Sequence, residues 1–240
     1  MGDAFATLTL EGRGKNCLST ELMRRVIAQL DRTGGRPLLV VGSGDTFSAG
    51  LNLKEVAAAD LAAMERYLGL LDEMIDAFFS YEAPVAACVN GHAIAGGCVI
   101  ALCADFRVAL DDPLVRIGLN EVALGLEFPP KILRVAKHRL APPLRDRVLL
   151  EAGLYDPRTA MAFGFVDEVS RDPLASARAW LEGVARHPAA IYAATKRTLR
   201  AGAVDLDDAE RRYVQSDMLP RWTAPAVKEA ARAALERRSG

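Results

Sequence analysis

Two glycine-containing loops carry residue types that could bind a developing negative charge. They span residues 47–53 (FSAGLNL) and 90–98 (NGHAIAGGC), and each follows an apolar, strand-like segment. The second loop leads directly into an apolar helix, whose first backbone N–H groups have no partner within the helix and favour an anion. Gly96 and Gly97 would let a ligand approach that backbone closely. Small residues at such turns also serve tight packing, and the loops alone do not decide between the two roles.

Glu121 is the candidate for proton transfer. It lies in a mainly apolar stretch, residues 117–130 (IGLNEVALGLEFPP). A carboxyl group that is desolvated there has a raised pKa, which suits a general base near neutral pH. The alternative is a helix cap or a buried ion pair with Arg107 or Arg116, and periodicity leaves both open. Neither loop matches a dinucleotide-binding fingerprint or a P-loop, and the sequence has no GxSxG.

Strands and helices alternate in the first half of the chain, and these elements must position the loops. Alternating or apolar runs predict strands at residues 5–10, 38–41, 83–89, 106–109 and 114–117. Helical periodicity predicts a helix that Ser19 caps and that runs to about Arg32, and further helices at 60–80 and 96–103. From about Pro129 the pattern is mostly helical, over residues 142–152, 157–163, 172–187, 188–201, 206–218 and 224–238. We therefore expect an α/β core, residues 1–187, and a C-terminal helical region, residues 188–240.

The composition indicates an ordinary globular protein with one sizeable core. The 240 residues are 51% hydrophobic and 25% charged, and 30 basic residues against 31 acidic ones give a net charge of −1. This balance excludes a globally basic protein that binds nucleic acid. No stretch reaches the ~18 apolar residues of a membrane span, and no signal peptide is recognisable, so we expect a cytoplasmic location. Four scattered cysteines and three histidines predict neither a disulfide framework, nor a metal site, nor a redox cofactor.

Taken together, three segments resemble the crotonase family, the enoyl-CoA hydratase/isomerase superfamily. They are FSAGLNLKE, NGHAIAGGCVIALCADFRVA and IGLNEVALGL, and their order and separation are also similar to those of the family. The resemblance covers nearly the whole chain and continues through YDPRTAMAFGFVDEV at residues 155–169. Within the family, the sequence is most similar to the mitochondrial-type Δ3,Δ2-enoyl-CoA isomerases. The resemblance implies an α/β fold, the crotonase-like spiral of ββα units, with a C-terminal α-helical region.

The resemblance also implies an acyl-CoA thioester as substrate, with coenzyme A as part of that substrate rather than a separate cofactor. The backbone N–H groups of Leu51 and Gly96 would form an oxyanion hole for the thioester carbonyl. The other residues that it places in the substrate site are Ser48, Ala49 and Gly50 at the adenine end, Gly97 and Val99, and Lys54 or Lys228 toward a CoA phosphate. In the family the C-terminal helices form a homotrimer or a dimer of trimers. Such an interface would suit Tyr213, Met218, Leu219 and Trp222.

Of the two catalytic glutamate positions of the family, one falls on Glu121 and the other on Val99. Hydration uses both carboxylates to hold and activate water, and valine can do neither. Double-bond migration needs one base, which removes a proton from C2 of a β,γ-enoyl thioester and returns it at C4. Two preorganised N–H donors stabilise the dienolate between these steps, each by ~3–4 kcal/mol of barrier. The pattern predicts an isomerase that uses Glu121 alone, with the apolar Val99 excluding water.

Glu127 leaves a second interpretation open. Six extended residues span up to ~20 Å, so Glu127 could lie near Glu121 and act as the missing acid of a hydratase, which is a lyase. It could instead be a solvated residue or an ion-pair partner of Lys131, and this is the interpretation we favour. Two further alternatives are thioester hydrolysis through the same oxyanion hole and a catalytically silent acyl-CoA-binding paralogue.

Overall fold

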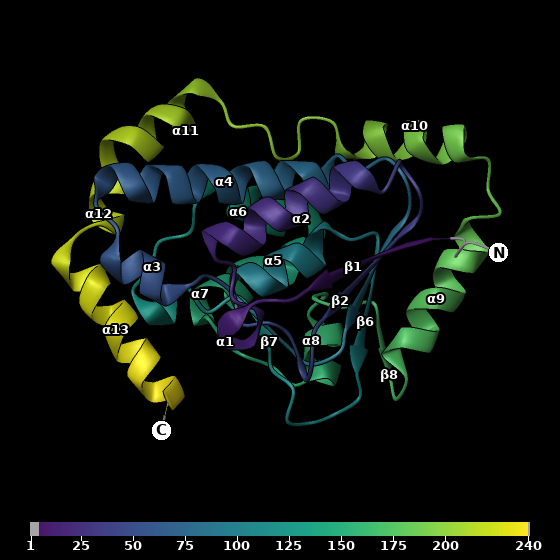
Figure 1. Cartoon of the computed structure of the whole chain (residues 1–240), viewed down its shortest axis with the longest axis horizontal. Helices are drawn as coiled ribbons and strands as arrows, with labels where there is room; N and C mark the ends of the chain where they lie inside the picture. Colours follow the sequence, from purple (N-terminus) through teal and green to yellow (C-terminus); the bar gives the residue numbers. More distant parts are fainter. Residues whose placement is uncertain (1–4, 240) are drawn as a thin grey trace.

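Two parallel sheets carry the fold (Figure 1), for which the computed structural model describes residues 5–239. The larger sheet contains, in order across it, β1 (Ala6–Leu10), β2 (Leu38–Gly42), β4 (Val85–Val89), β6 (Phe106–Leu110) and β8 (Glu168–Ser170). The smaller sheet contains, in order, β3 (Thr46–Ser48), β5 (His92–Ile94) and β7 (Ile117–Gly118). Neighbouring strands in both sheets run parallel, which requires crossover connections between them.

The chain passes between the two sheets in a repeating order. Each of β2, β4 and β6 is followed by one strand of the smaller sheet and then by helix. The helical parts are α3 (Leu53–Ala58) with α4 (Leu61–Phe79), then α5 (Gly96–Cys103), then η1 (Val122–Leu124) with α6 (Pro130–Arg139). Each repeat adds one strand to both sheets, so the units advance as a spiral. This confirms the predicted α/β fold, a crotonase-like spiral of ββα units.

Helix starts follow the capping residues. Ser19 caps α2 (Thr20–Arg32), because its Oγ accepts a hydrogen bond from the Leu22 amide at 3.1 Å, and Asp60 caps α4 in the same way. The predicted helical C-terminal half is also present. Its helices are α7 (Pro142–Glu151), α8 (Pro157–Ala162), α9 (Pro173–Val184), α10 (Ala189–Arg200), α11 (Asp208–Tyr213), the π-helical turn η2 (Val214–Met218), α12 (Leu219–Trp222) and α13 (Pro225–Ser239). A further short helix, α1 (Arg13–Asn16), precedes α2.

Several short strands differ from the prediction. β3 and β5 are three-residue strands; β3 leads into the first glycine-containing loop and β5 lies inside the second. β8 interrupts the region that we expected to be purely helical. The predicted strand at 114–117 was too long, because only Ile117 joins β7 and Leu114 is exposed. Strands this short show no periodicity along the sequence, and they are defined by pairing with their neighbours.

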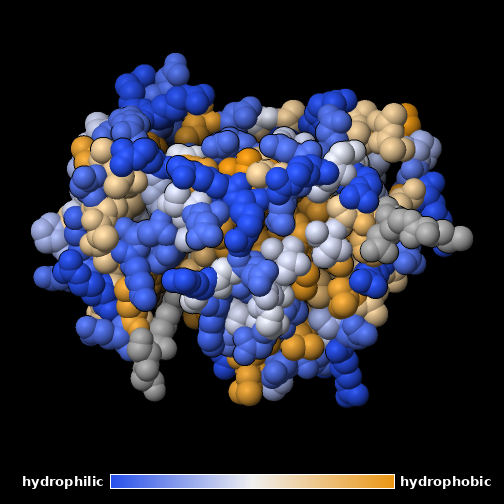
Figure 2. Space-filling model, in the orientation of Figure 1, coloured by the Kyte–Doolittle hydropathy of each residue, from blue (hydrophilic) through white to orange (hydrophobic). Residues whose placement is uncertain are grey.

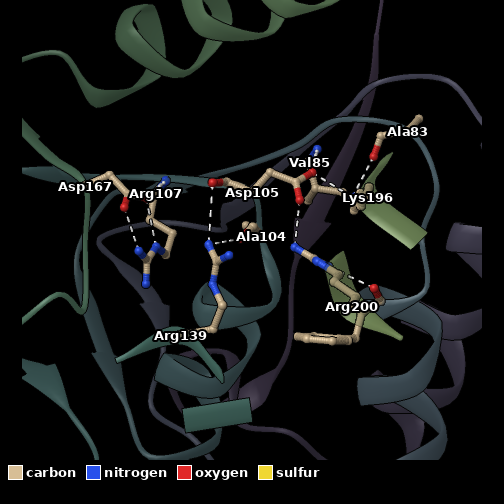
Figure 3. Close-up of polar contacts among 10 residues, drawn as sticks. Ala83, Val85, Ala104, Asp105, Arg107, Arg139, Asp167, Lys196 and Arg200 are labelled. Carbon is tan, nitrogen blue, oxygen red and sulfur yellow. Dashed lines mark hydrogen bonds and ion pairs between the residues drawn. The ribbon is translucent and has the colours of Figure 1, made fainter. Parts of the chain in front are cut away.

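Buried charges, rather than an apolar face, hold α10 against the core (Figure 3). The carboxylate of Asp105 accepts hydrogen bonds from Lys196 and Arg200 of α10, each at 2.6 Å. Arg200 also donates to the Phe79 carbonyl at the C-terminal end of α4, where a cation is favourable. Lys196 and Arg200 are buried, while the apolar Leu199 beside them is exposed. The cluster therefore fixes the start of the C-terminal region to the rest of the chain.

The last helices fold back over the core of their own chain. Met218, Leu219 and Trp222 are buried in the main hydrophobic cluster, and Trp222 is only 1% exposed. The prediction that these three side chains suit an interface between subunits is therefore wrong, and of the four only Tyr213 is exposed. Buried side chains between Val204 and Ala234 belong to the same hydrophobic cluster as the core of the first part of the chain. The role of residues 188–240 in oligomerisation stays a prediction.

Hydrophilic side chains cover most of the face seen in Figure 2, and smaller apolar patches lie between them. Within residues 5–239, no helix is both long enough and apolar enough to cross a lipid bilayer. The same part of the chain contains no cluster of three or more His, Cys, Asp or Glu side chains arranged to hold a metal ion.

Candidate active site

The two glycine-containing loops pack directly against each other. A Cβ atom on Gly50 would lie 2.6 Å from a backbone carbonyl oxygen of the second loop and 3.2 Å from the Gly96 nitrogen. A Cβ atom on Gly97 would lie 2.3 Å from the Ser48 carbonyl oxygen. Gly50 also has a φ of +83°, which residues with side chains rarely adopt. The loops can meet in this way only because these positions are glycine, and the contact brings the segment of Leu51 next to the start of α5.

The amides of Leu51 and Gly96 have the properties of oxyanion-hole donors. Gly96 is the first residue of α5, so its N–H has no acceptor within the helix. Ala95, the N-cap, has φ 51° and ψ −123°, a conformation that persists only where the surrounding structure enforces it. In the described part of the chain, we find no hydrogen bond donated by either the Leu51 or the Gly96 amide. Two adjacent N–H groups of this kind can stabilise an oxygen that becomes negatively charged.

Glu121 is buried, and one of its carboxylate oxygens is unpaired. The residue is 3% exposed at the start of η1, and its Oε2 has no hydrogen-bond partner among the described residues. Burial raises the pKa of this carboxyl from its ordinary value of 4.5 to about 8, and a hydrogen bond from its own backbone amide opposes the shift only in part. The pKa therefore lies in the range of a general base that works near neutral pH.

The ion-pair and cap alternatives for Glu121 are wrong. Arg107 instead pairs with Asp167, with nitrogen–oxygen distances of 2.9 and 2.6 Å (Figure 3). The guanidinium of Arg116 donates to two nearby backbone carbonyls. The Glu121 side chain makes no capping hydrogen bond at the start of η1. Neither arginine therefore offsets the burial of this carboxyl, and burial is the main reason that its pKa rises.

The smaller sheet places Glu121 near the first turn of α5. Ile94 of β5 pairs with Gly118 of β7, and the Ala95 amide donates to the Gly118 carbonyl at 2.9 Å. Glu121 follows Gly118 by three residues, at the end of the same segment. The thiol of Cys98, in the first turn of α5, lies within electrostatic range of Glu121, and burial raises the pKa of this thiol so that it stays protonated. The base and the two amides thus come together around the N-terminus of α5.

Val99 occupies the position at which the family resemblance implies a second glutamate. Its side chain is 1% exposed, and its amide donates to the Ala95 carbonyl at 3.0 Å as part of the first turn. Side chains on a helix lean toward its N-terminus, so the Val99 side chain is directed toward the end that carries Gly96. Position 99 therefore carries an apolar side chain that is shielded from water.

Glu127 forms an ion pair with a residue that we did not predict. Its carboxylate oxygens accept hydrogen bonds from Arg221 of α12 at 2.8 and 3.2 Å. Lys131, the predicted partner, instead pairs with Asp76 at 2.5 Å. The predicted pair of Glu127 with Lys131 is therefore wrong. The favoured interpretation of Glu127 as an ion-paired residue nevertheless agrees with the structure.

The other predicted substrate-site residues surround the first loop. Ser48 and Ala49 are buried, and Ser48 Oγ donates to the Asn16 carbonyl at 2.8 Å, so this side chain supports the loop from inside. Lys54 is exposed at the start of α3. Lys228 lies on α13, which packs along α3 and also contacts η1. The last helix therefore lies against both the element after Leu51 and the element after Glu121.

Two residues that scaffold the first loop were not predicted. The side-chain amide of Asn16 donates to the Thr46 carbonyl at 2.7 Å and so ties β3 to the segment before α2. Asn16 has a φ of +57°, which asparagine tolerates better than most residues, and an asparagine between a strand and a helix was the available signal. Tyr67 of α4 donates its hydroxyl to the Leu18 carbonyl at 2.6 Å. A tyrosine on the apolar face of a helix needs such a partner, although its identity could not be read from the sequence.

Comparison with known proteins identifies the family. A model of the enoyl-CoA hydratase/isomerase family matches residues 2–240. The chain belongs to this family. Human mitochondrial enoyl-CoA delta isomerase 1 is 28% identical over 173 residues, which cover 70% of this chain and 57% of the human protein. The probable enoyl-CoA hydratase echA17 of Mycobacterium avium is 30% identical over 223 residues, which cover 88% of this chain and 86% of that protein.

A solved structure of a human mitochondrial isomerase has the same fold. The crystal structure of human mitochondrial delta3-delta2-enoyl-CoA isomerase superposes with a TM-score of 0.92, covering 98% of this chain and 94% of the human chain at 23% identity. The relatives carry the names of both isomerases and hydratases. This chain spans 57% of the length of the human isomerase, and family membership alone does not choose between the two reactions, so that choice depends on the residues of the site.

Proposed function

We propose that this protein is a Δ3,Δ2-enoyl-CoA isomerase in which Glu121 is the one catalytic base. Glu121 removes a proton from C2 of a 3-enoyl-CoA, and the electron pair of the C2–H bond delocalises onto the thioester oxygen. The amides of Leu51 and Gly96 hold the charge of this dienolate. The protonated carboxyl then returns the proton at C4, which leaves the double bond between C2 and C3. The reaction gains and loses no atoms, so it needs neither water nor a redox partner.

A lone buried carboxyl beside the start of α5 is the observation that carries this proposal. Glu121 is 3% exposed and its Oε2 has no partner among the described residues, so it is available to a substrate. A pKa of about 8 suits both steps of a proton shuttle, because the carboxyl takes up and releases a proton with little bias near neutral pH. Val99 supplies no second acid, and its buried apolar side chain disfavours water at the same place.

Hydration is the second candidate reaction, and it requires Glu127 to replace the missing acid. Arg221 binds both oxygens of Glu127, whose side chain remains partly exposed. A carboxylate that is neutralised and solvated in this way would have to leave its ion pair to activate water beside Glu121. The contacts of Glu127 therefore support isomerisation over hydration.

A paired assay on the purified protein tests the proposal. One reaction starts from 3-hexenoyl-CoA and follows the absorbance of the conjugated 2-enoyl thioester, and the other starts from crotonyl-CoA and follows its loss. We expect isomerisation without hydration. Glu121→Gln should lower kcat about 10²- to 10⁴-fold and preserve binding of the thioester, because it removes the proton carrier and keeps the shape. Glu127→Gln is the matched control and should change kcat by less than about twofold.

Three outcomes would contradict the proposal, and each points to a different alternative. Efficient hydration by the wild type that Glu127→Gln abolishes would assign a hydratase with two acids. Release of free CoA, detected with a thiol reagent, would indicate thioester hydrolysis. Tight binding of both thioesters without turnover would indicate a catalytically silent acyl-CoA-binding paralogue.

A further inference from the structure

Tyr67 links three segments of the chain at the residue after Leu51. It lies on the face of α4 that packs into the core and is 4% exposed. Its hydroxyl donates to the Leu18 carbonyl at 2.6 Å and accepts a hydrogen bond from the Asn52 amide at 3.0 Å. Burial raises the pKa of this hydroxyl, so it stays protonated and able to donate. A residue of α4 thereby connects the segment before α2 to the loop that leads into α3.

The two peptide planes of Leu51 are both fixed. On one side, the Leu18 amide donates to the Gly50 carbonyl at 2.8 Å. That carbonyl and the Leu51 N–H belong to one trans peptide and point in opposite directions, so the bond turns the Leu51 N–H away from Leu18. On the other side, the Asn52 N–H is directed at the Tyr67 hydroxyl. These two hydrogen bonds set the direction of the N–H that lies between them in the chain.

The Tyr67 hydroxyl lies beside a sheet-like contact in which the Asn52 amide faces the Leu18 carbonyl. Leu18 and Leu51 make an isolated parallel bridge, and in such a bridge the Asn52 amide and the Leu18 carbonyl are natural partners. The hydroxyl bonds to both of these groups. Without it, a part-buried donor and a buried acceptor have only each other as partners, and they must move closer to form a full hydrogen bond. Movement would rotate the peptide between Leu51 and Asn52 and shift the Leu51 amide.

We propose that Tyr67 is a positioning residue for the oxyanion hole, because its hydroxyl holds the Leu51 N–H in the direction that meets the thioester oxygen. The inference rests on the proposed function, since it assumes that Leu51 and Gly96 bind this oxygen. Oxyanion stabilisation depends on donors that are fixed before the reaction, and a misplacement of about 1 Å can lower a rate about 100-fold. Recognition of the CoA portion does not involve this N–H. Loss of the hydroxyl therefore lowers kcat and leaves KM nearly unchanged.

The test compares Tyr67→Phe with Tyr81→Phe. Tyr81 offers the same chemical change away from the loops, because its hydroxyl bonds to Thr33 Oγ1 and to the Arg36 carbonyl, each at 2.6 Å, beyond the ends of α2 and α4. With 3-hexenoyl-CoA as substrate, we expect Tyr67→Phe to lower kcat about 10- to 100-fold with KM within about threefold. Tyr81→Phe should leave both constants within about twofold of the wild type.

Infrared spectroscopy of a bound thioester separates positioning from support of the fold. The probe is [1-13C]hexanoyl-CoA, a saturated thioester that cannot isomerise. In the wild type, two N–H donors should polarise the carbonyl and shift its stretching band to lower frequency on binding. Tyr67→Phe should show a smaller shift at saturating ligand, and Tyr81→Phe the full shift. A residue that only supports the fold would alter the amount of folded protein and not the band of the bound ligand.

The outcomes distinguish failure of this inference from failure of the proposed function. A folded Tyr67→Phe with wild-type kcat and a wild-type carbonyl shift would overturn the role of Tyr67. A wild-type protein that neither isomerises the substrate nor shifts the carbonyl band would overturn the oxyanion hole itself. If Tyr67→Phe does not fold, Tyr67→4-aminophenylalanine keeps a donor toward Leu18 and weakens the acceptor for Asn52. A reduced band shift is expected in that variant, and an unchanged one would overturn the inference.

Discussion

Glu121→Gln tests two consequences of one raised pKa, the first of them on the reaction rate. Burial lifts the pKa of the Glu121 carboxyl from 4.5 to about 8. A base accepts a proton only when it is ionised, so about a tenth of the enzyme is competent at pH 7 and about nine tenths at pH 9. We expect kcat/KM of the wild type to rise about tenfold between these pH values. The residual rate of Glu121→Gln should be low and should not follow this titration.

The second consequence is a fold that becomes less stable as the pH rises. The Glu121 carboxyl loses its proton near pH 4.5 in the unfolded chain but only near pH 8 in the folded one. Its stabilising contribution is therefore complete below pH 4.5 and is lost as the pH rises through about 8. Each unit of pKa corresponds to about 1.4 kcal/mol, so the full loss is about 5 kcal/mol. Because glutamine does not ionise, Glu121→Gln should match the wild type near pH 5 and exceed its free energy of unfolding by up to about 5 kcal/mol at pH 9.

Urea unfolding of both proteins at pH 5, 7 and 9, followed by tryptophan fluorescence, measures the effect on stability. Initial rates from 3-hexenoyl-CoA over the same range measure the effect on the reaction. Glu127→Gln is the control, because the ion pair of Glu127 is partly exposed and contributes little to stability. The free energy of unfolding of this variant should differ from that of the wild type by a constant amount over this pH range. Two results together would refute the reasoning: a free energy of unfolding of Glu121→Gln that differs from the wild type by the same amount at every pH, and a wild-type rate that is already maximal at pH 6. The Glu121 carboxyl would then be hydrated rather than buried.

Three further substitutions test contacts in and around the site. Gly97→Ala should lower the free energy of unfolding by about 1–3 kcal/mol and reduce the isomerase rate, because the new methyl group would lie 2.3 Å from the Ser48 carbonyl oxygen. Thermal unfolding and initial rates measure these two effects. Val99→Glu should introduce hydration of crotonyl-CoA by adding a second carboxyl near Glu121, and it should lower the Tm because the position is buried. Hydration no greater than in the wild type would contradict the proposal that Val99 prevents this reaction. Asp105→Asn should lower the free energy of unfolding by about 3–5 kcal/mol with KM unchanged, because Lys196 and Arg200 of α10 lose their counterion. A loss below about 1 kcal/mol in urea unfolding would show that this cluster is not needed to hold α10 against the core.

The loops and the base could be found in the sequence because their signals are local. Gly50 lies between an apolar strand and a helix, and Gly97 lies in the first turn of the next helix; at both positions only a residue without a side chain allows the close backbone approach seen here. Glu121 is the charged residue at the centre of an apolar run, and that surrounding predicts its burial. The order of strands and helices follows from hydrophobic periodicity, and the start of α2 follows from Ser19.

The remaining features depend on contacts between distant segments, which leave no pattern along the chain. Glu127 and its partner Arg221 are 94 residues apart, and Asn16 is 30 residues from the carbonyl of Thr46 that it binds. An apolar side chain such as Trp222 can be buried in its own chain or against another subunit, and the sequence is the same in both cases. The strands of the smaller sheet are two or three residues long, so their pairing exists only in the folded protein.

The side chains of α5 decide which reaction this arrangement favours. In the proposed site, the first residue of the helix, Gly96, would supply one oxyanion donor, and Val99 lies three residues later on the same side of the helix. Because helical side chains lean toward the N-terminus, the group at position 99 is directed toward the place where charge develops. A carboxylate there would hold water and repel the charge of Glu121. In the proposed reaction, valine leaves Glu121 as a single base and excludes the water that hydration consumes. Burial of Glu121 raises the pKa of this base to about 8, near the pH at which a proton is easily taken up and returned.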